Sequence, residues 1–460
     1  MYRSTDFDHK QLGLLHFNQS CGMQLDLANE WVRTANKLPW EAWEPLYAAL
    51  FSGIKGNVAK PCRMVLGSLI IQMRMGFSDR DLVKQIMENP YYQFFIGLDE
   101  FQQDPPFAPT LLVEWRKRLD LDFVIKVNDV LCDAMPKGVR RSFGAKTSGT
   151  LIATQICDAT VAPQYIRFPQ DTSLLNEARM KLEAIIDSIC TTYALPKPRT
   201  YRKVAHKEYL SIAKMKKPSK DRRRKAVQQQ LAYVRRDMKY VDDFIQAGYE
   251  ISEKHQDLLA IIRKLYEQQQ YMYDNNTHVV EDRIVSISQP YVRPIVRGKA
   301  SKPTEFGAKL HLSIDERGFA RIEYLSFDAF NEGPMLQEAL NAYKYHHGRY
   351  PERVLVDQIY RTTSNIAFCK EHGIRISGKK LGRPFSDEKR NEKVAKTATK
   401  DNTDRIQIER YFSVAKRKNG MGLITKKRED TSLSTIAMSV LVTNIFGSFK
   451  LALKELAQGP

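Results

Sequence analysis

Leu151-Ile-Ala-Thr-Gln-Ile-Cys-Asp158 is a short apolar run that ends in an acidic residue. A run of this length and composition predicts a buried β-strand. The residues before it show mainly the spacing of amphipathic helices, so the pattern changes near Ser148. We therefore predict a helical N-terminal domain over residues 1–145 and a second domain that contains a β-sheet.

Signals for strands return after Pro290. We predict strands at Lys309–Ile314 and Ala320–Phe327, joined as a hairpin by the turn Asp315–Gly318. Further strands are predicted at Arg353–Val356 and Ile374–Ser377, and helices at Pro334–Tyr345, Ser364–His372 and Asp404–Lys418. Asp404 fits the N-cap of the last helix. This order predicts an α/β fold with a mixed sheet, interrupted after its first strand by a helical insertion. The sheet domain would comprise residues 146–173 and 290–460, and the insertion residues 174–289.

The N-terminal region has clear helix signals. Leu27–Phe51 carries three Trp residues at roughly helical spacing and is broken at Pro39. Met64–Met75 predicts a helix that ends at Gly76, and Ser78 fits the N-cap of the next one. Two helices joined by a short turn match a helix-turn-helix, although a plain helical hairpin is the more common arrangement.

The charge of the chain is strongly unbalanced. Its net charge is +19 and its pI is near 9.5. Lys197–Lys239 contains 16 basic residues and only three acidic ones. Such a density is unfavourable unless a polyanion neutralises it, and we expect DNA phosphates to do so. A solvated helix face is the alternative. The residues that we single out for DNA contact are Lys216, Lys217, Arg222, Arg223, Arg224 and Lys225.

Several other classes of protein fit poorly. Thr431–Phe449 lacks charges but holds too many polar residues for a membrane span, so we predict a buried helix. The six cysteines are scattered, which suggests a reducing cytosol and neither a zinc site nor a disulfide framework. The polar start of the sequence does not resemble a signal peptide. Motifs for zinc proteases and P-loop nucleotide binding do not occur in the sequence.

Three acids stand out as candidate metal ligands. Asp158 and Asp357 each follow an apolar run, at what we expect to be strand ends, and Glu409 shares a helix face with Arg405 and Lys416. Phosphodiester transfer by metal-dependent enzymes requires carboxylates that together hold two divalent ions. The alternatives are aspartates that cap turns and an exposed Arg–Glu pair that contributes only tenths of a kcal/mol.

The last helix resembles a known signature. Arg405, Glu409 and Lys416 match the last three positions of the Tyr-x2-Arg-x3-Glu-x6-Lys pattern. This pattern is found in insertion-sequence transposases whose catalytic domain is ribonuclease-H-like and carries two aspartates and a glutamate. Asn402 stands at the position of the tyrosine, so that position departs from the pattern.

Further segments resemble the family numbered five among insertion sequences. Residues 157–169 are similar to its first-aspartate region. Residues 356–361, 369–377 and Leu381-Gly-Arg-Pro384 are similar to its second-aspartate region. The first 120 or so residues are similar to its helical N-terminal domain, so the resemblance covers nearly the whole chain. The long interval between the two aspartates is explained by the basic insertion.

The resemblance implies a function and a set of roles. Asp158, Asp357 and Glu409 would bind two Mg²⁺ or Mn²⁺ ions, water would cut the element end, and the freed 3′-hydroxyl would attack target DNA. Arg405 and Lys416 would hold phosphates near the scissile bond. The N-terminal helices would recognise terminal inverted repeats, although the basic insertion is an equally good candidate.

The resemblance also implies partners and a location. The partners would be double-stranded DNA, as element ends and as target, and a second copy of the chain, because two ends must be brought together. We expect a cytoplasmic, nucleoid-associated bacterial protein. Two alternatives remain: a DNA-binding regulator that does not cut, and a nuclease that hydrolyses without joining strands.

Overall fold

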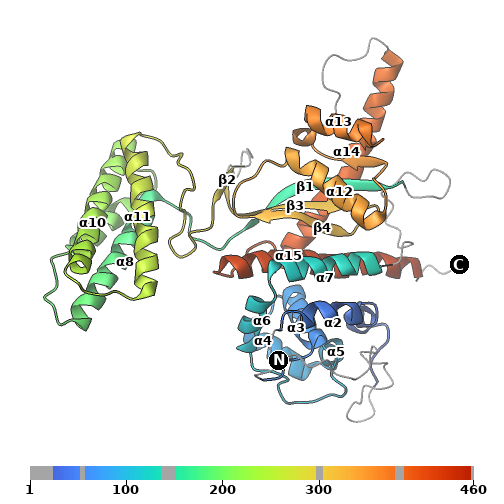
Figure 1. The fold of residues 1–460 in the computed structure, drawn as a ribbon, viewed down its shortest axis with the longest axis horizontal. Coiled ribbons are helices and arrows are strands. Elements are labelled where there is room, and N and C mark those ends of the chain that lie inside the picture. The colour runs from blue at the N-terminus through green and yellow to red at the C-terminus, as the bar shows by residue number, and fades with distance from the viewer. Residues whose placement is uncertain (1–23, 52–56, 136–151, 297–303, 379–387, 457–460) are drawn as a thin grey trace. The chain divides into compact units, whose positions relative to one another are not determined.

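The computed structural model describes residues 24–51, 57–135, 152–296, 304–378 and 388–456. Leu151, the predicted boundary at residue 145, and the motif at Leu381–Pro384 lie outside these ranges. The chain forms two compact units, which we call unit 1 (Met1–Pro163 and Ala308–Pro460) and unit 2 (Gln164–Gly307). Figure 1 shows the helices and the sheet of unit 1 and the helices of unit 2.

The N-terminal part of unit 1 is helical, as predicted. Its helices are α1 (Glu30–Ala35), α2 (Trp40–Ala48), α3 (Cys62–Met75), α4 (Asp79–Glu88), α5 (Pro90–Phe95), α6 (Leu111–Arg118) and α7 (Leu121–Ala134). Gly76 ends α3 with a φ of +75°, a conformation that favours glycine. Ser78 caps α4 by accepting a hydrogen bond from the backbone N–H of Asp81 (3.2 Å). Helices α5 and α7 had not been predicted.

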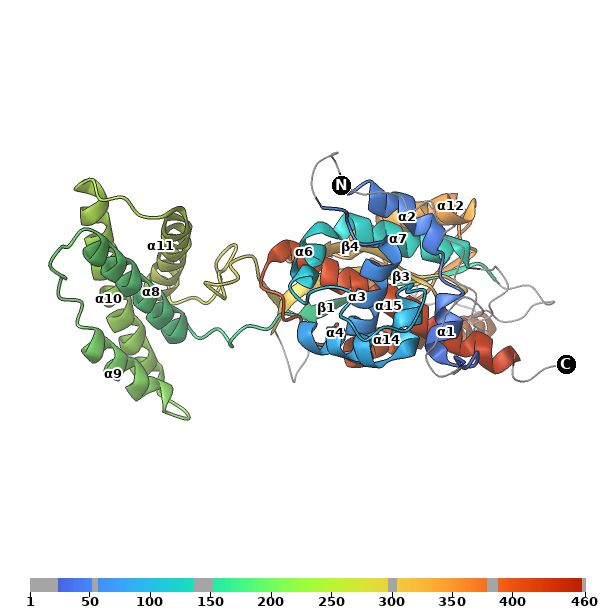
Figure 2. The same ribbon diagram turned by 90° about the horizontal axis from the view of Figure 1, so that it is seen from below.

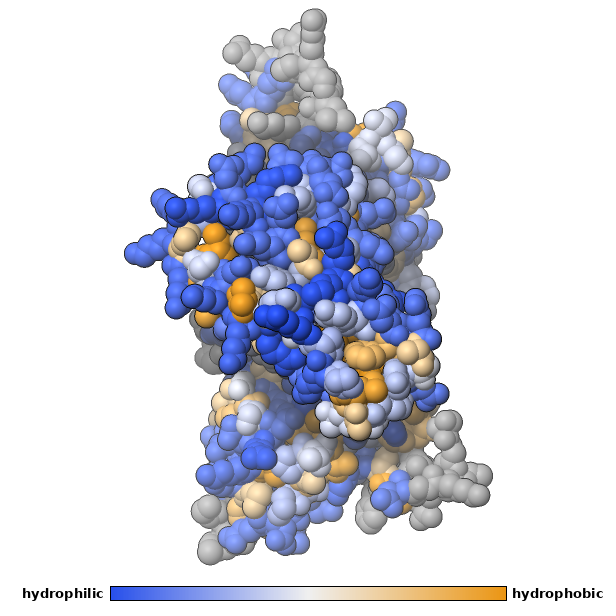
Figure 3. Space-filling view, turned by 90° about the vertical axis from the view of Figure 1, so that its left-hand side faces the viewer, coloured by the Kyte–Doolittle hydropathy of each residue, from blue (hydrophilic) through white to orange (hydrophobic). Residues whose placement is uncertain are grey.

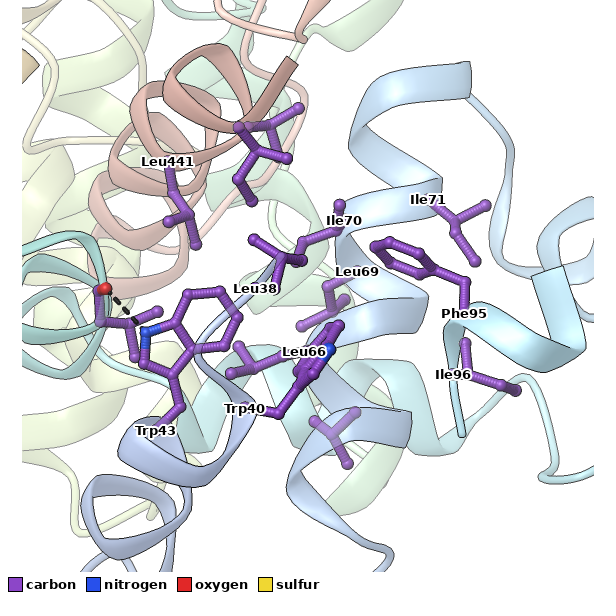
Figure 4. Packing of buried hydrophobic residues seen from close by; sticks show 14 of the residues in the cluster. Leu38, Trp40, Trp43, Leu66, Leu69, Ile70, Ile71, Phe95, Ile96 and Leu441 are labelled. Carbon is purple, nitrogen blue, oxygen red and sulfur yellow. Dashed lines mark hydrogen bonds between the residues drawn. The ribbon is translucent and has the colours of Figure 1, made fainter. Parts of the chain in front are cut away.

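These helices share one hydrophobic core with the C-terminal helix α15 (Glu429–Leu456). Figure 4 shows Trp40 and Trp43 packed among aliphatic side chains of α3, with Leu441 of α15 beside them. The indole N–H of Trp43 donates to the backbone oxygen of Val127 on α7 (3.0 Å). Figure 2 shows α3 alongside α15. The N-terminal helices are therefore held in the same unit as the sheet.

The sheet of unit 1 is mixed, as predicted. Its strands are β1 (Thr154–Pro163), β3 (Thr304–Ile314), β4 (Ala320–Ser326), β5 (Arg353–Leu355) and β6 (Arg375–Ile376). The strand order runs β3-β1-β5-β6, with β4 paired to β3. β3 and β4 form the predicted antiparallel hairpin, and Gly318 turns between them with a φ of +86°. β5 is parallel to both β1 and β6. A helical N-terminal region followed by this sheet matches a ribonuclease-H-like domain.

Four helices accompany the sheet. They are α12 (Leu336–His347), α13 (Thr363–Glu371), α14 (Glu388–Lys418) and α15. The prediction that the third of these begins at Asp404 was wrong, because α14 begins at Glu388 and Asp404 lies well inside it. Asp404 is therefore no N-cap. Its carboxylate instead pairs with the guanidinium of the buried Arg353 on β5 (2.8 Å).

The run Thr431–Phe449 lies within α15, and most of its described apolar residues are buried, Leu433 being partly exposed. This observation confirms the prediction of a buried helix. Within the described ranges, none of the helices combines the length and the apolarity that a membrane span requires.

Unit 2 consists mainly of a helical bundle. Its helices are α8 (Asp171–Thr192), α9 (Arg202–Ala213), α10 (Lys220–Gln246) and α11 (Glu253–Asp274), and a short strand, β2 (Pro294–Val296), pairs with the start of β3. Aliphatic residues of α8, α10 and α11 form the core. Arg179 and Glu183 of α8 form a buried ion pair inside it. The face of the molecule that carries these helices is mostly hydrophilic (Figure 3).

Candidate active site

Asp158 lies near the middle of β1, not at its end as predicted, because β1 continues to Pro163. Its carboxylate Oδ1 accepts a hydrogen bond from the backbone N–H of Ala159 (2.8 Å). The side chain is 20% exposed. The strand thus holds this acid rigidly and leaves one side of it accessible.

Asp357 follows the end of β5, as predicted. Parallel pairing of Ile156 with Leu355 is the last recorded pair between β1 and β5. Asp158 and Asp357 each follow this pair by two residues, and the charge of Asp357 acts on Asp158, so the two acids lie near one another. Adjacent strands lie about 4.8 Å apart. Asp357 also caps the short helix η4 (Gln358–Tyr360) by accepting from the backbone N–H of Gln358 (2.7 Å).

Glu409 is linked to Asp158 through Arg405. Glu409 and Arg405 both lie on α14, one turn apart. The guanidinium of Arg405 lies 3.4 Å from Asp158 Oδ2 and 3.5 Å from Glu409 Oε1. The side chain of Glu409 is 57% exposed, whereas that of Arg405 is 22% exposed. Arg405 is thus a cation between two acids that come from distant parts of the chain.

Lys416 attaches α14 to the same strand. Its ammonium donates a hydrogen bond to the hydroxyl of Thr160 (2.9 Å). Thr160 and Asp158 are two residues apart on β1, so their side chains lie on one face of the sheet. Arg405 and Lys416 therefore fix α14 against the face of β1 that carries Asp158.

The environment of Asp158 disfavours its ionised form. Burial, as the main cause, raises the pKa of Asp158 to about 6, and the charges of Glu332 and Asp357 act in the same direction. The hydrogen bond from Ala159 and the charge of Arg405 lower the pKa but do not offset the burial. Negative charge is thus concentrated at this point of the sheet.

Glu332 is a further acid near the site that had not been singled out in the sequence. It lies between β4 and the short helix η3 (Gly333–Met335), and its Oε1 is 2.8 Å from the ammonium of Lys309. Its charge contributes to the raised pKa of Asp158. The sequence contained a signal for Glu332, because this acid directly precedes Gly-Pro at the junction between a predicted strand and a predicted helix.

The donor set fits a hard divalent cation in its chemistry. Asp158, Asp357 and Glu332 supply only oxygen ligands, which Mg²⁺ and Mn²⁺ prefer. A cation would offset the negative charges of Glu332 and Asp357, which add to the effect of burial in raising the pKa of Asp158. Within the described residues, however, no three acidic, His or Cys side chains converge tightly enough to hold an ion as they stand. Glu409 in particular faces Arg405.

The basic residues singled out in the sequence lie in unit 2. Lys216 and Lys217 lie between α9 and α10, and Arg222–Lys225 lie in the first turns of α10; all are exposed. Within the described part of the chain none of them forms an ion pair. Arg224 differs from the others, because its guanidinium stacks on Tyr273 (4.1 Å) and donates to the backbone oxygen of that residue (3.0 Å).

Comparisons with known proteins match two segments of the chain to transposase families. Residues 354–446 match the family described as transposase DDE domain, and residues 20–118 match that described as transposase domain (DUF772). Asp357 and Glu409 lie in the first of these segments, whereas Asp158 lies in neither.

The comparison with individual proteins found one partial relative and no solved structure. Over 154 residues the chain is 27% identical to an uncharacterized protein of Rhizobium meliloti, ORF8 in the nfe locus. That stretch is 33% of this chain and 70% of the relative. No solved structure matches the chain. The chain therefore carries a transposase DDE domain, preceded by an N-terminal DUF772 transposase domain.

Proposed function

We propose that this protein is the transposase of an insertion sequence of the family numbered five, and that it cuts and joins DNA strands with Asp158, Asp357 and Glu409. The observation that carries the proposal is the placement of these acids. Asp158 lies on β1, Asp357 follows the neighbouring parallel strand β5, and the guanidinium of Arg405 lies between Asp158 and Glu409.

In this proposal the three carboxylates hold two Mg²⁺ or Mn²⁺ ions, which activate the attacking oxygen and stabilise the leaving oxygen. Asp158 must be deprotonated for this role, and its carboxylate is held in place by the backbone N–H of Ala159. Glu409 must turn from Arg405 toward the aspartates. The 57% exposure of its side chain supports this rotation, because little packing opposes it.

Arg405 is then released from its acids and can hold a DNA phosphate, as a planar guanidinium does well. Lys416 supplies a second positive charge on the same helix. Water attacks the phosphodiester at the element end, and the leaving 3′-oxygen takes up a proton. That 3′-hydroxyl then displaces a 3′-oxygen in target DNA, so one phosphodiester bond breaks as another forms.

Binding of double-stranded DNA is assigned to two regions. The exposed cations at the start of α10 would contact phosphates and supply affinity. The N-terminal helices, including α3 and α4, would read the inverted repeats.

The proposal also includes a division of the chain into an N-terminal domain (1–145), a catalytic domain (146–173 and 290–460) and an insertion (174–289). It further includes assembly of the protein into at least a dimer on DNA.

The test is a strand-transfer assay with a labelled element end, a target plasmid and Mg²⁺. Joined product supports the transposase, cutting without joining supports a nuclease, and binding without cutting supports a regulator. Asp158→Asn, Asp357→Asn and Glu409→Gln should each lower cleavage by at least about 10³-fold, because the ligand set is incomplete. DNA affinity measured without Mg²⁺ should stay within about twofold.

Glu371→Gln is the matched control, since Glu371 is an exposed acid at the end of α13 in the same unit. It should cleave like the parent protein. Normal cleavage by Asp357→Asn would refute the catalytic assignment, whatever the DNA affinity of the variant.

A further inference from the structure

The first turns of α14 carry a row of exposed lysines. α14 begins at Glu388, and its start projects past α13 in Figure 1. Between Lys389 and Lys400 none of the described side chains is buried, and the first buried residue of the helix is Asp401. We call residues 388–400 the lysine arm.

The lysines of the arm share one face. Lys389, Lys393, Lys396 and Lys400 are spaced by four, three and four residues, which is the spacing that aligns side chains along a helix. Over these 11 steps the row spans about 16 Å. All four are exposed, and within the described residues none of them has an ion-pair partner. The face is therefore a continuous stripe of positive charge.

The arm gains little stability from within the protein. Like charges one turn apart destabilise a helix by about 0.2–0.5 kcal/mol per pair. Thr397 and Thr399 direct their hydroxyls back to the carbonyls of Lys393 and Ala395, which does not strengthen a helix. The arm also lacks a buried apolar face, which stabilises most helices in proteins. A polyanion along the stripe would remove the repulsion.

The base of the arm is firmly anchored beside the site. Asp401 is 4% exposed and pairs with Arg353 of β5 (3.4 Å) and with Arg375 of β6 (2.6 Å). Glu409 follows Lys400 by nine residues of the same helix, or about 14 Å. A ligand held along the arm is therefore oriented relative to the proposed catalytic acids by one continuous helix.

We propose that the lysine arm binds the phosphate backbone of double-stranded DNA and directs the duplex toward Glu409. The proposal rests on the proposed function. The charge, the regular spacing and the anchorage point to a phosphate backbone, because phosphates repeat at short intervals and neutralise each lysine without reading sequence. The arm would thus add to affinity and position but not to the choice of sequence.

The test compares two triple variants of equal net charge. Lys393→Gln/Lys396→Gln/Lys400→Gln removes the stripe, and glutamine keeps the helix propensity of lysine. Lys126→Gln/Lys344→Gln/Lys370→Gln removes three exposed lysines elsewhere in unit 1. Binding of a labelled 30-base-pair duplex of arbitrary sequence is measured by fluorescence anisotropy without Mg²⁺, over a range of NaCl concentrations.

The stripe variant should lose at least about tenfold in affinity at low salt, and the slope of log K against log[NaCl] should become shallower by about 2–3, close to one per lost phosphate contact. The control should change the slope by less than about 1. Lys393→Arg/Lys396→Arg/Lys400→Arg should bind like the parent protein. An unchanged slope in the stripe variant, or an equal change in the control, overturns the proposal.

This experiment is independent of catalysis. If Asp357→Asn cleaves normally but the stripe variant loses salt-dependent affinity, the catalytic assignment fails and the arm remains. If cleavage depends on the three acids but the two triple variants bind alike, the arm fails and the catalytic assignment remains.

Discussion

The guanidinium of Arg405 lies 3.4 Å from the carboxylate of Asp158, although 247 residues separate them in the chain. This contact brings helix α14 against strand β1 and places a fixed cation beside a partly buried acid. Arg405 also contacts Glu409, one turn further along α14, so it lies between Asp158 and Glu409.

Asp158→Asn should stabilise the protein above pH 6. The pKa of Asp158 is raised to about 6 by burial, above the ordinary value of about 4, so the folded protein binds the proton more tightly than the unfolded chain does. Stability is therefore lost as the pH rises from about 4 to 6. The amide carries no charge and avoids this loss.

Thermal unfolding at pH 4 and pH 8 measures the effect. The variant should gain up to about 2–3 kcal/mol over the parent protein at pH 8 and close to nothing at pH 4. A gain of the same size at both pH values would show that ionisation of Asp158 is not its cause.

Arg405→Gln should bind Mn²⁺ more tightly than the parent protein in the absence of DNA. Arg405 neutralises Asp158 and Glu409, so a divalent cation must compete with it. A partly exposed ion pair contributes up to about 1 kcal/mol, which corresponds to roughly a two- to fivefold change in affinity. Titration followed by electron paramagnetic resonance of free Mn²⁺ reports this change without any reaction. Arg405→Lys, which keeps the charge, should lie between the two, and weaker binding by Arg405→Gln would contradict the competition.

Asp401→Leu should destabilise unit 1 by about 3–5 kcal/mol. It leaves the 5%-exposed side chain of Arg353 with only Asp404 as an acidic partner, and removing one member of a buried pair is costly. Denaturant unfolding measures the loss. Arg353→Met together with Asp401→Leu should recover part of it, because both members of this buried pair are then absent and only the partly buried Asp404 loses its partner. No recovery in the double variant would point to a role other than charge compensation.

Replacing Lys216, Lys217, Arg222 and Arg223 together by glutamine should weaken DNA binding and flatten its salt dependence by up to about 4 in the slope of log K against log[NaCl]. These cations are exposed, and they form no ion pair within the described residues. Arg236→Gln is a useful contrast, because Arg236 pairs with the buried Asp237 and stacks on Tyr233, so its loss should affect the stability of unit 2 more than the salt slope. A salt slope equal to that of the parent protein in the fourfold variant would contradict a phosphate-binding role.

The local patterns of the sequence predicted many elements well. The cap at Ser78, the stop at Gly76 and the hairpin turn at Gly318 were readable because each depends on a few neighbouring residues. The mixed sheet followed from the order of apolar runs. The candidate acids were also found from sequence, through apolar runs that end in an acid and through one helical signature.

The start of α14 was not predicted, because its first turns lack the apolar periodicity that marks an amphipathic helix. The pairing of Asp401 with Arg353 and Arg375 anchors that helix, and these partners come from separate strands. Helix α7 was missed although the sequence carries signals for it, since Asp120 is its N-cap and Phe123, Val127 and Leu131 recur at helical spacing. Helix α5 has only six residues, which is too short to show a helical period.

The sequence by itself thus predicted many of the helices, turns and strands and the candidate acids, since those properties depend on short-range spacing. Only the tertiary structure showed that β1 and β5 bring Asp158 and Asp357 near one another, that Arg405 lies between Asp158 and Glu409, and that Lys416 meets Thr160. These relationships depend on strand register and on packing between residues far apart in the chain, and local propensity carries no information about such distances.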